Sequence, residues 1–241
     1  MMTIETIHQK EENLFQEWGK QFELNGHTGF CKDGLIFNGE LHNELKNRKS
    51  SNQEENWMNA KRRILFFMKE PNDNADQDYR EWGLYQQTSS TFFRFIYSWL
   101  NGLSTVTAKS PIPPITTELD LSLPLCIVNA KKASGGSSAS YSEIWAHEDQ
   151  YRNLLRQQFD IYAPNIIVCG GSWNMAKIVK RIYNDIEFTL MENSDWIWYS
   201  IEKQMILIDS YHPCAFKSND AKYNKLIEHF QKFLELKVFD L

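Results

Sequence analysis

Closely spaced cysteines are missing from this sequence. Its 241 residues include four cysteines, Cys31, Cys126, Cys169 and Cys214, with no Cys-x-x-Cys pair. Zinc sites and disulfide frameworks depend on clustered cysteines, so reduced and buried thiols are the expected state. No histidine and carboxylate pair lies at metal-ligand spacing on one predicted element either. We therefore expect a protein without a metal or any other cofactor.

Long apolar segments and a positive charge excess are also missing. No segment reaches the apolar length that a membrane span requires, and the first residues are polar, so we expect a cytoplasmic protein with no membrane contact. Lysine and arginine number 26 against 31 aspartate and glutamate residues, which gives a net charge of -5. This balance argues against a strong nonspecific duplex binder. It leaves a local basic groove open, because phosphate contacts depend on where the lysines lie.

Aromatic residues, by contrast, are abundant, with 8 Trp, 10 Tyr and 15 Phe. Most such residues fill cores, and lining a pocket for a flat ligand is the alternative use for a few of them. The length is typical of one large α/β domain. We expect a single domain over residues 1–241, in which residues 1–60 form a helical N-terminal extension packed on the rest.

Short apolar runs alternate with helical patterns along the chain. Buried strands are predicted at 64–68, 123–128, 165–169 and 205–208, and helices at 4–24, from about 88, at 142–162, 172–183 and 219–236. This alternation predicts an α/β fold with a mainly parallel sheet covered on both faces. The small-residue stretch 133–140 is either a flexible linker or a loop at the sheet edge. A linker would separate two complete cores, and neither half of the chain holds enough elements for one.

Polar side chains follow these strands at the points where each strand ends. Glu70 comes just before a proline, which favours an extended turn, and its carboxylate either faces a ligand or caps a nearby amide. Asn129 lies next to Lys131 and Lys132, and its amide can donate and accept at once, as reading a base edge requires. An Asx turn is the alternative for Asn129.

Two further turns complete this set. Gly170, Gly171 and Ser172 open a helix and could offer backbone amides to an anion, although a close strand-to-helix turn explains them equally and no full dinucleotide fingerprint is present. His212 precedes a proline in a turn where surface histidines are common. Ligands of open α/β sheets bind beyond the carboxyl ends of the strands, so all four clusters are expected to meet at one edge.

The order of these clusters resembles that of the uracil-DNA glycosylase superfamily. Residues 68–72 (Met-Lys-Glu-Pro-Asn) are similar to that family's Gly-Gln-Asp-Pro-Tyr or Gly-Glu-Ala-Pro-Gly motif, and 125–130 to its strand ending in asparagine. Residues 166–172 are similar to its later strand with a small-residue turn, and 212–214 to its His-Pro-Ser motif. The resemblance covers residues 60–235, and it depends on the serial order of the motifs more than on any one of them.

The resemblance implies a three-layer α/β/α sandwich that hydrolyses the N-glycosidic bond of a damaged or modified base in DNA. Glu70 would stabilise the cationic sugar and His212 the departing base, and Asn129 would recognise the flipped base. Trp82 or Tyr85 would stack on the flipped base. Phe216 would insert into the duplex as a wedge. The remaining residues would contact nucleic acid or phosphate: Gly170, Gly171, Ser172 and Lys131.

The chain also departs from the family's motifs. Met68 stands at a usual glycine, Glu70 is one methylene longer than the aspartate of the first motif, and Asn72 replaces tyrosine or glycine. The four cysteines do not match those of the family's iron-sulfur members. A second hypothesis is therefore a non-catalytic module that binds a nucleobase, nucleotide or single strand. In a third hypothesis, the residues of the four clusters only stabilise turns and have no functional role. The expected partner is DNA or a nucleobase-containing small molecule, and we expect a monomer.

Overall fold

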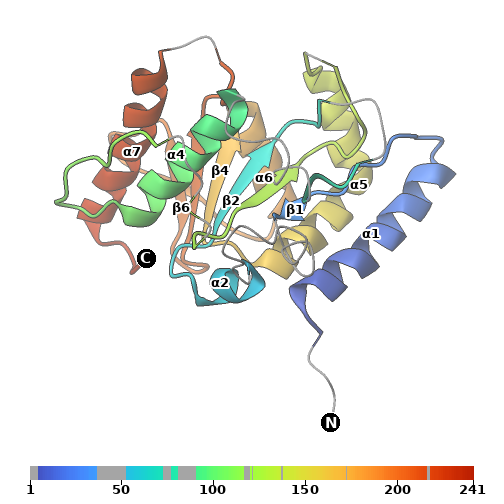
Figure 1. The fold of residues 1–241 in the computed structure, drawn as a ribbon, viewed down its shortest axis with the longest axis horizontal. Helices are drawn as coiled ribbons and strands as arrows, with labels where there is room; N and C mark the ends of the chain where they lie inside the picture. Colours follow the sequence, from blue (N-terminus) through green and yellow to red (C-terminus); the bar gives the residue numbers. More distant parts are fainter. Residues whose placement is uncertain are drawn as a thin grey trace, which may run out of the picture.

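The computed structural model describes residues 5–36, 53–72, 77–80, 91–116, 120, 122–136, 138–171, 173–215 and 218–241. In this part of the chain, seven strands form one sheet in the order β1-β3-β2-β4-β7-β6-β5 (Figure 1). The bounds of the strands are β1 (Gly34–Leu35), β2 (Ile64–Met68), β3 (Cys126–Asn129), β4 (Ile166–Gly170), β5 (Thr189–Leu190), β6 (Ile197–Ser200) and β7 (Met205–Ser210).

The four central strands β3, β2, β4 and β7 are parallel to one another. Antiparallel strands extend the sheet at both sides, because β1 pairs with β3 at one edge and β6 and β5 follow β7 at the other. The sheet is therefore mixed, with a parallel centre. This confirms the predicted α/β fold.

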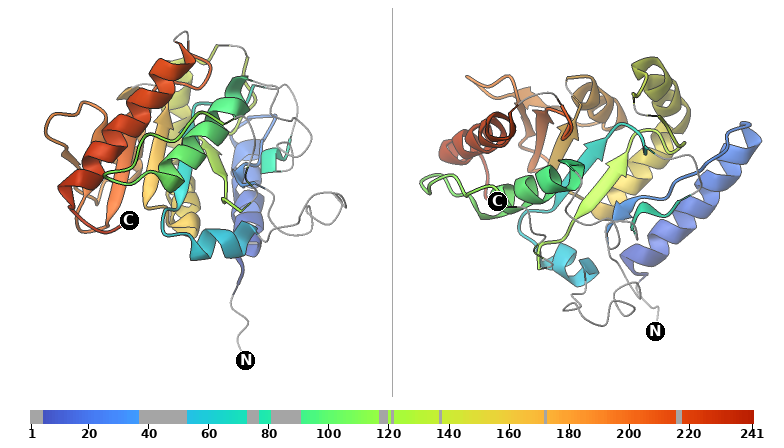
Figure 2. Two further views of the ribbon diagram at one scale, coloured as in Figure 1. Left: turned by 60° about the vertical axis from the view of Figure 1, so that its left-hand side comes forward. Right: turned by 45° about the horizontal axis from the view of Figure 1, so that its top comes forward.

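Helices cover both faces of the sheet (Figure 2). Their bounds are α1 (Ile7–Leu24), α2 (Gln53–Asn59), α4 (Thr91–Thr105), α5 (Tyr141–Tyr162), α6 (Trp173–Ile182) and α7 (Asn219–Leu236). Alternate residues of the four central strands join two separate cores: Phe67 packs in the core that includes α1, α5 and α6, and Phe66 in the core that includes α4 and α7. Because β2 is buried along its whole length, its sequence is continuously apolar rather than alternating. The result is the expected three-layer α/β/α arrangement.

Several element bounds differ from the predicted ones. β3 begins at Cys126 rather than at residue 123, since Pro124 lacks the N–H that a central strand needs. β7 continues two residues further, to Ser210, because Gly170 of β4 still pairs with it there. β5 and β6 were not predicted: β5 has two exposed residues, and β6 alternates only weakly in burial. The predicted helix start near residue 88 lies outside the described residues.

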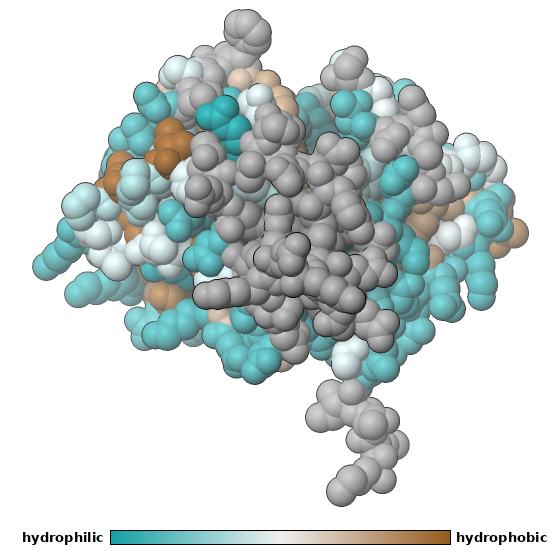
Figure 3. All heavy atoms as spheres, viewed as in Figure 1, coloured by the Kyte–Doolittle hydropathy of each residue, from teal (hydrophilic) through white to brown (hydrophobic). Residues whose placement is uncertain are grey.

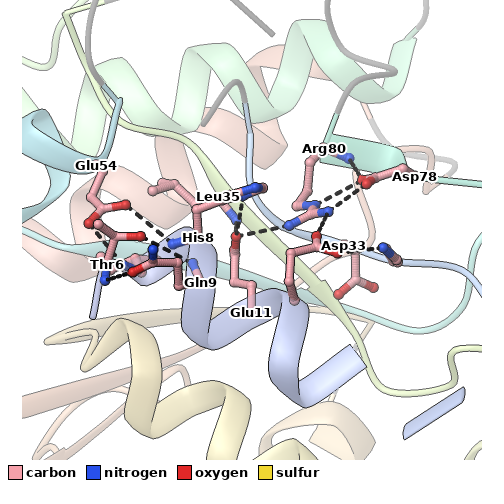
Figure 4. A network of polar contacts seen from close by, with 12 residues as sticks. Thr6, His8, Gln9, Glu11, Asp33, Leu35, Glu54, Asp78 and Arg80 are labelled. Atoms are coloured by element: carbon pink, nitrogen blue, oxygen red, sulfur yellow. Dashed lines mark hydrogen bonds and ion pairs between the residues drawn. The ribbon is translucent and has the colours of Figure 1, made fainter. Parts of the chain in front are cut away.

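The N-terminal segment is anchored by polar contacts as well as by packing. Helix α1 begins with a capping box between Thr6 and Gln9 and packs against α5. Glu11 of α1 accepts hydrogen bonds from the Leu35 N–H of β1 and from Arg80 (Figure 4). Residues before position 60 thus contribute the strand β1 as well as the helices α1 and α2. The single domain and the N-terminal extension stay predictions.

The described surface is mainly hydrophilic in the view of Figure 3, with scattered hydrophobic atoms. Leu24, Met58 and Ile201 are exposed large hydrophobic residues, on α1, on α2 and in the turn after β6 respectively. Within the described ranges, no helix combines the length and the apolar character that crossing a bilayer would demand.

Candidate active site

The parallel strands place three candidate site residues where the strands end, at the carboxyl edge of the sheet. Asn129 is the last residue of β3, and Glu70 and His212 each follow their strand, β2 and β7, by two residues. Parallel strands have their carboxyl ends at the same edge, so the three residues share it. Asn129 and His212 are three strand positions apart in the order β3-β2-β4-β7, or about 14 Å at a spacing of about 4.8 Å per strand. Side chains that extend toward each other from the two outer strands can contact one nucleotide between them.

The Gly170-Gly171 turn allows the neighbouring segments to approach closely. A Cβ on Gly170 would lie 2.5 Å from Met68 Sδ and 3.5 Å from Pro213 Cδ, and one on Gly171 would lie 2.7 Å from Lys69 Cε. The Gly171 N–H donates to the carbonyls of Cys169 and Ser210, each at 3.2 Å. This amide is satisfied within the protein, so close packing is what the turn visibly provides. Ser172 lies outside the described residues.

The Glu70 carboxylate is held by a lysine. Lys131 Nζ donates to Glu70 Oε2 at 2.7 Å and to Glu143 Oε2 at 3.1 Å, and the Glu70 side chain is 5% exposed. Burial lowers the pKa of Lys131, but its hydrogen bonds and charge interactions with the two carboxylates outweigh burial and raise the pKa above its ordinary value. Among the described residues, Glu70 Oε1 has no hydrogen-bond partner. Lys131, predicted to contact nucleic acid, has its ammonium committed to carboxylates.

Gly135 covers the Glu70 carboxylate. A Cβ on Gly135 would lie 2.6 Å from Glu70 Oε2, closer than any normal contact, and the Gly135 N–H donates to the Pro71 carbonyl at 2.8 Å. The stretch around residue 135 is therefore a loop packed on the site, which argues against the linker interpretation. Only a residue without a side chain fits over the carboxylate in this geometry.

We expect Gly135→Ala to destabilise the protein by about 1–3 kcal/mol, because the added methyl group displaces Glu70 from Lys131. Chemical denaturation of the variant measures this loss. Gly136→Ala is the matched control, since a Cβ at Gly136 would meet nothing within 4 Å. Equal stability of the two variants would contradict the tight cover over Glu70.

Asn129 is 7% exposed and is bound to Asp33. Its backbone N–H and its Nδ2 donate to Asp33 Oδ2 at 2.9 and 3.0 Å. Its Oδ1 forms no hydrogen bond to any described residue. The amide is thus fixed on its nitrogen side and keeps an unused acceptor.

His212 is a neutral hydrogen-bond donor in this structure. Its Nδ1 accepts from the Cys214 backbone N–H at 3.1 Å, so the proton of the neutral ring lies on Nε2. Burial, followed by the positive charges of Lys69 and Lys222, lowers the pKa of His212 to about 4. Lys222 also donates to the carbonyls of Pro213 and Ala215 at 2.9 and 3.1 Å and holds this turn to α7. Within the described part of the chain, Nε2 has no partner.

We expect His212 to titrate near pH 4 and to carry its proton on Nε2 at neutral pH. Nitrogen-15 NMR of the imidazole ring measures both, and the unfolded protein is the control because an unperturbed histidine titrates near 6.5. In Lys222→Met the midpoint should rise, since one of the cations that disfavour the charged ring is removed. A midpoint above 6 in the parent protein would contradict the neutral donor.

Several predicted residues cannot be placed, and several contributing residues were not predicted. Trp82, Tyr85 and Phe216 lie outside the described residues, like Ser172. The sequence interpretation missed Asp33 and Lys222. Asp33 binds Asn129, 96 positions away along the chain, and Lys222 binds the turn after His212, up to 9 positions away. For Asp33 the sequence carries no local signal. For Lys222, its place on the apolar side of a helix just after the His212 turn was a signal that could have been used.

Comparison with known proteins gives a partial match. No family model matches the chain. A stretch of 85 residues, 35% of this chain, is 32% identical to the type-4 uracil-DNA glycosylase of Sulfurisphaera tokodaii. The chain resembles the uracil-DNA glycosylase superfamily. The matched stretch spans 39% of the length of that glycosylase, and the resemblance expected from the motifs is confirmed to that extent.

The cysteines do not fit the iron-sulfur cluster of some uracil-DNA glycosylases. All four are among the described residues, and Cys31, Cys126 and Cys169 are fully buried, whereas Cys214 is exposed after β7. Cys126 lies on β3 and Cys169 on β4, with β2 between these strands. Over the described ranges, no three His, Cys, Asp or Glu side chains are grouped so that they could hold a metal ion. These thiols cannot act together as ligands in this fold.

A hollow of about 430 Å³ lies at the opposite edge of the sheet. Its lining comes from the segments that precede β2 and β3, from the end of α4 and from the last residue, and includes Asn59, Arg62, Val106, Leu123 and Leu241. The Arg62 guanidinium already donates to the carbonyls of Leu103 and Val106. This hollow is therefore distinct from the candidate site that Glu70, Asn129 and His212 form at the carboxyl edge.

Proposed function

We propose that this protein excises a damaged or modified base from DNA by hydrolysing the N-glycosidic bond. The observation that carries the proposal is that a carboxylate, Glu70, and a neutral histidine, His212, both follow parallel strands at the carboxyl edge of the sheet. Both keep one functional atom, Oε1 and Nε2 respectively, without a partner among the described residues. The partial match to a type-4 uracil-DNA glycosylase supports DNA as the substrate class.

The reaction needs opposite charges stabilised at its two ends. As the bond between sugar C1′ and the base nitrogen breaks, the bonding electrons leave with the base and the sugar becomes cationic. Glu70 stabilises the cationic sugar and orients the water whose oxygen bonds to C1′. The Nε2–H of His212 donates to an oxygen of the departing base, where negative charge develops. The proton that the water loses finally neutralises the base.

A non-catalytic module for nucleobases, nucleotides or single strands is the second candidate. The observation in its favour is that Lys131 neutralises Glu70 at 2.7 Å, while Gly135 covers the carboxylate. An ion pair of this kind reduces the field that a carboxylate exerts on a cationic sugar. The same edge would then recognise a base without breaking its bond.

Oligonucleotides that carry uracil, hypoxanthine or another modified base at one position test the two candidates. After incubation with the protein, hot alkali cleaves the strand wherever a base has been removed, and the same sequence with normal bases is the control. We expect cleavage at one of the modified positions. Tight binding of such strands without any cleavage would favour the binding module. The absence of both binding and cleavage would contradict both candidates.

A further inference from the structure

Asp33 lies at the centre of a buried polar cluster behind Asn129. The Asp33 side chain is 1% exposed, and each of its oxygens accepts hydrogen bonds. Oδ2 accepts from the backbone N–H and the Nδ2 of Asn129, and Oδ1 accepts from Lys132 Nζ and from Gln158 Nε2, the latter at 3.2 Å. Every group that meets the carboxyl is a donor, so the cluster fits an ionised, acceptor-only Asp33.

These hydrogen bonds fix the orientation of the Asn129 amide, that is, which of Oδ1 and Nδ2 faces Asp33. A half turn of the amide would place Oδ1 against Asp33 Oδ2, so that two acceptors would face each other and a charge-assisted hydrogen bond would be lost. Asp33 is itself held in place, because Lys132 and Gln158 bind its other oxygen and Gln158 also binds its backbone carbonyl at 3.0 Å. The unpaired acceptor of Asn129 is therefore always Oδ1.

The direction of an amide decides which base edge it can pair with. Uracil and hypoxanthine present a ring N–H beside a carbonyl oxygen, whereas cytosine and adenine present a ring nitrogen lone pair beside an amino group. An amide that is free to turn over can pair with either pattern, because it carries one acceptor and one donor side by side. A fixed Oδ1 requires a donor in front of it and meets a lone pair with repulsion.

We propose that Asp33 determines base selectivity by locking the Asn129 amide, which restricts the site to bases with a ring N–H beside a carbonyl. The proposal rests on the proposed function in one respect, that Asn129 is the residue that meets the base. Asp33 precedes the segment 60–235 that carries the family resemblance, and it reaches the site from beside β1. It is a positioning residue that acts through Asn129.

Binding measurements test this role without requiring catalysis. The probes are oligonucleotides with 2′-fluoro-2′-deoxyuridine or 2′-fluoro-2′-deoxycytidine at one mismatched position, because the fluorine slows loss of the base. We expect the parent protein to bind the uracil probe with a Kd at least about tenfold lower than that of the cytosine probe. The reason is that uracil gains a hydrogen bond to Oδ1, whereas the cytosine lone pair is repelled by it. In Asp33→Asn the preference should fall to about twofold, mainly through tighter binding of the cytosine probe.

Two more variants separate selectivity from folding. Asp33→Asn leaves Lys132 buried without a charge partner, and its side-chain oxygen could still accept from Asn129, so Asp33→Leu/Lys132→Met is measured beside it. Leucine offers no acceptor to Asn129, so this double variant should also lose the preference, without an unpaired buried charge. Glu148→Gln is the matched control, since it also replaces a buried, cation-paired carboxylate, but one whose partners are Arg152 and Arg181 rather than Asn129, and it should keep the preference.

An unchanged preference in the double variant, or no preference in the parent protein, would overturn the role of Asp33. Release of uracil from an unfluorinated strand is assayed in parallel. If the parent protein prefers the uracil probe but releases no base, the glycosylase proposal fails and the assignment of Asp33 stands. If the parent protein releases uracil and the double variant keeps the preference, the glycosylase proposal stands and the assignment of Asp33 fails.

Discussion

Glu70→Gln should slow base release about a hundredfold and leave DNA affinity nearly unchanged. The carboxylate acts chiefly when the sugar becomes cationic, so its charge stabilises the transition state more than the bound substrate. Loss of one such electrostatic contact costs on the order of 3 kcal/mol in the barrier. Glutamine has nearly the same shape as glutamate, so the contacts around residue 70 are otherwise kept. Single-turnover rates and dissociation constants measured on the same oligonucleotide give both quantities.

Glu143→Gln is the matched control for that variant. Glu143 is the other carboxylate on Lys131, at 3.1 Å, but its side chain is 62% exposed and it lies at the start of α5 rather than at a strand end. We expect its substitution to change the rate of base release by no more than about twofold, as is usual for an exposed ion pair. Equal rates in Glu70→Gln and the parent protein would show that another carboxylate acts on the sugar.

Arg80→Met should cost about 3–5 kcal/mol of unfolding free energy, because it leaves a buried carboxylate without its cation. Arg80 lies between Glu11 and Asp78 (Figure 4) and donates to Glu11 at 3.0 Å. Glu11 has a fully buried side chain and also accepts from the Tyr162 hydroxyl at 2.5 Å. Urea denaturation of the variant and of the parent protein measures the loss. Arg156→Met is the control, since its partners are about half exposed and its loss should cost less than about 1 kcal/mol.

The same variant should also change the pH dependence of stability. Burial raises the pKa of Glu11 from 4.5 to about 7, and the charge of Arg80 is the largest of the effects that oppose this rise. A carboxyl with a raised folded pKa binds more protons in the folded state, so it contributes a loss of stability as the pH rises from about 4.5 through 7. Without Arg80 that window extends upward, and the variant should lose more stability at pH 8 than at pH 6. A loss no larger than that of Arg156→Met at both pH values would contradict the buried pair.

The central strands could be predicted from the sequence because they are buried on both faces, which makes their apolar runs continuous. The runs at β2 and β4 have no polar residue to interrupt them, and the turns after them are marked by Pro71 and by the two glycines of the Gly170-Gly171 turn. β5 and β6 escaped prediction because edge strands with partly exposed side chains have no such signature. Their strand conformation depends on pairing, of β6 with β7 and of β5 with β6.

That the candidate residues Glu70, Asn129 and His212 follow parallel strands could be predicted, but their hydrogen-bond partners could not. Any residue that follows a parallel strand lies at the carboxyl edge, so Glu70, Asn129 and His212 were candidates from their spacing alone. The contact of Glu70 with Lys131 joins residues 61 positions apart, and that of Asn129 with Asp33 joins residues 96 positions apart. Periodicity carries no information on such pairs. The states of the functional groups, a paired carboxylate and a locked amide, therefore emerge only from the fold.

A crystal structure of the protein with a product strand and the released base would test the central claim most directly. We expect the base at the carboxyl edge of β3 and β7, with its ring N–H on Asn129 Oδ1, one of its oxygens on His212 Nε2, and the abasic sugar facing Glu70. A base bound instead in the hollow at the opposite edge, among Asn59, Arg62 and Leu241, would contradict it.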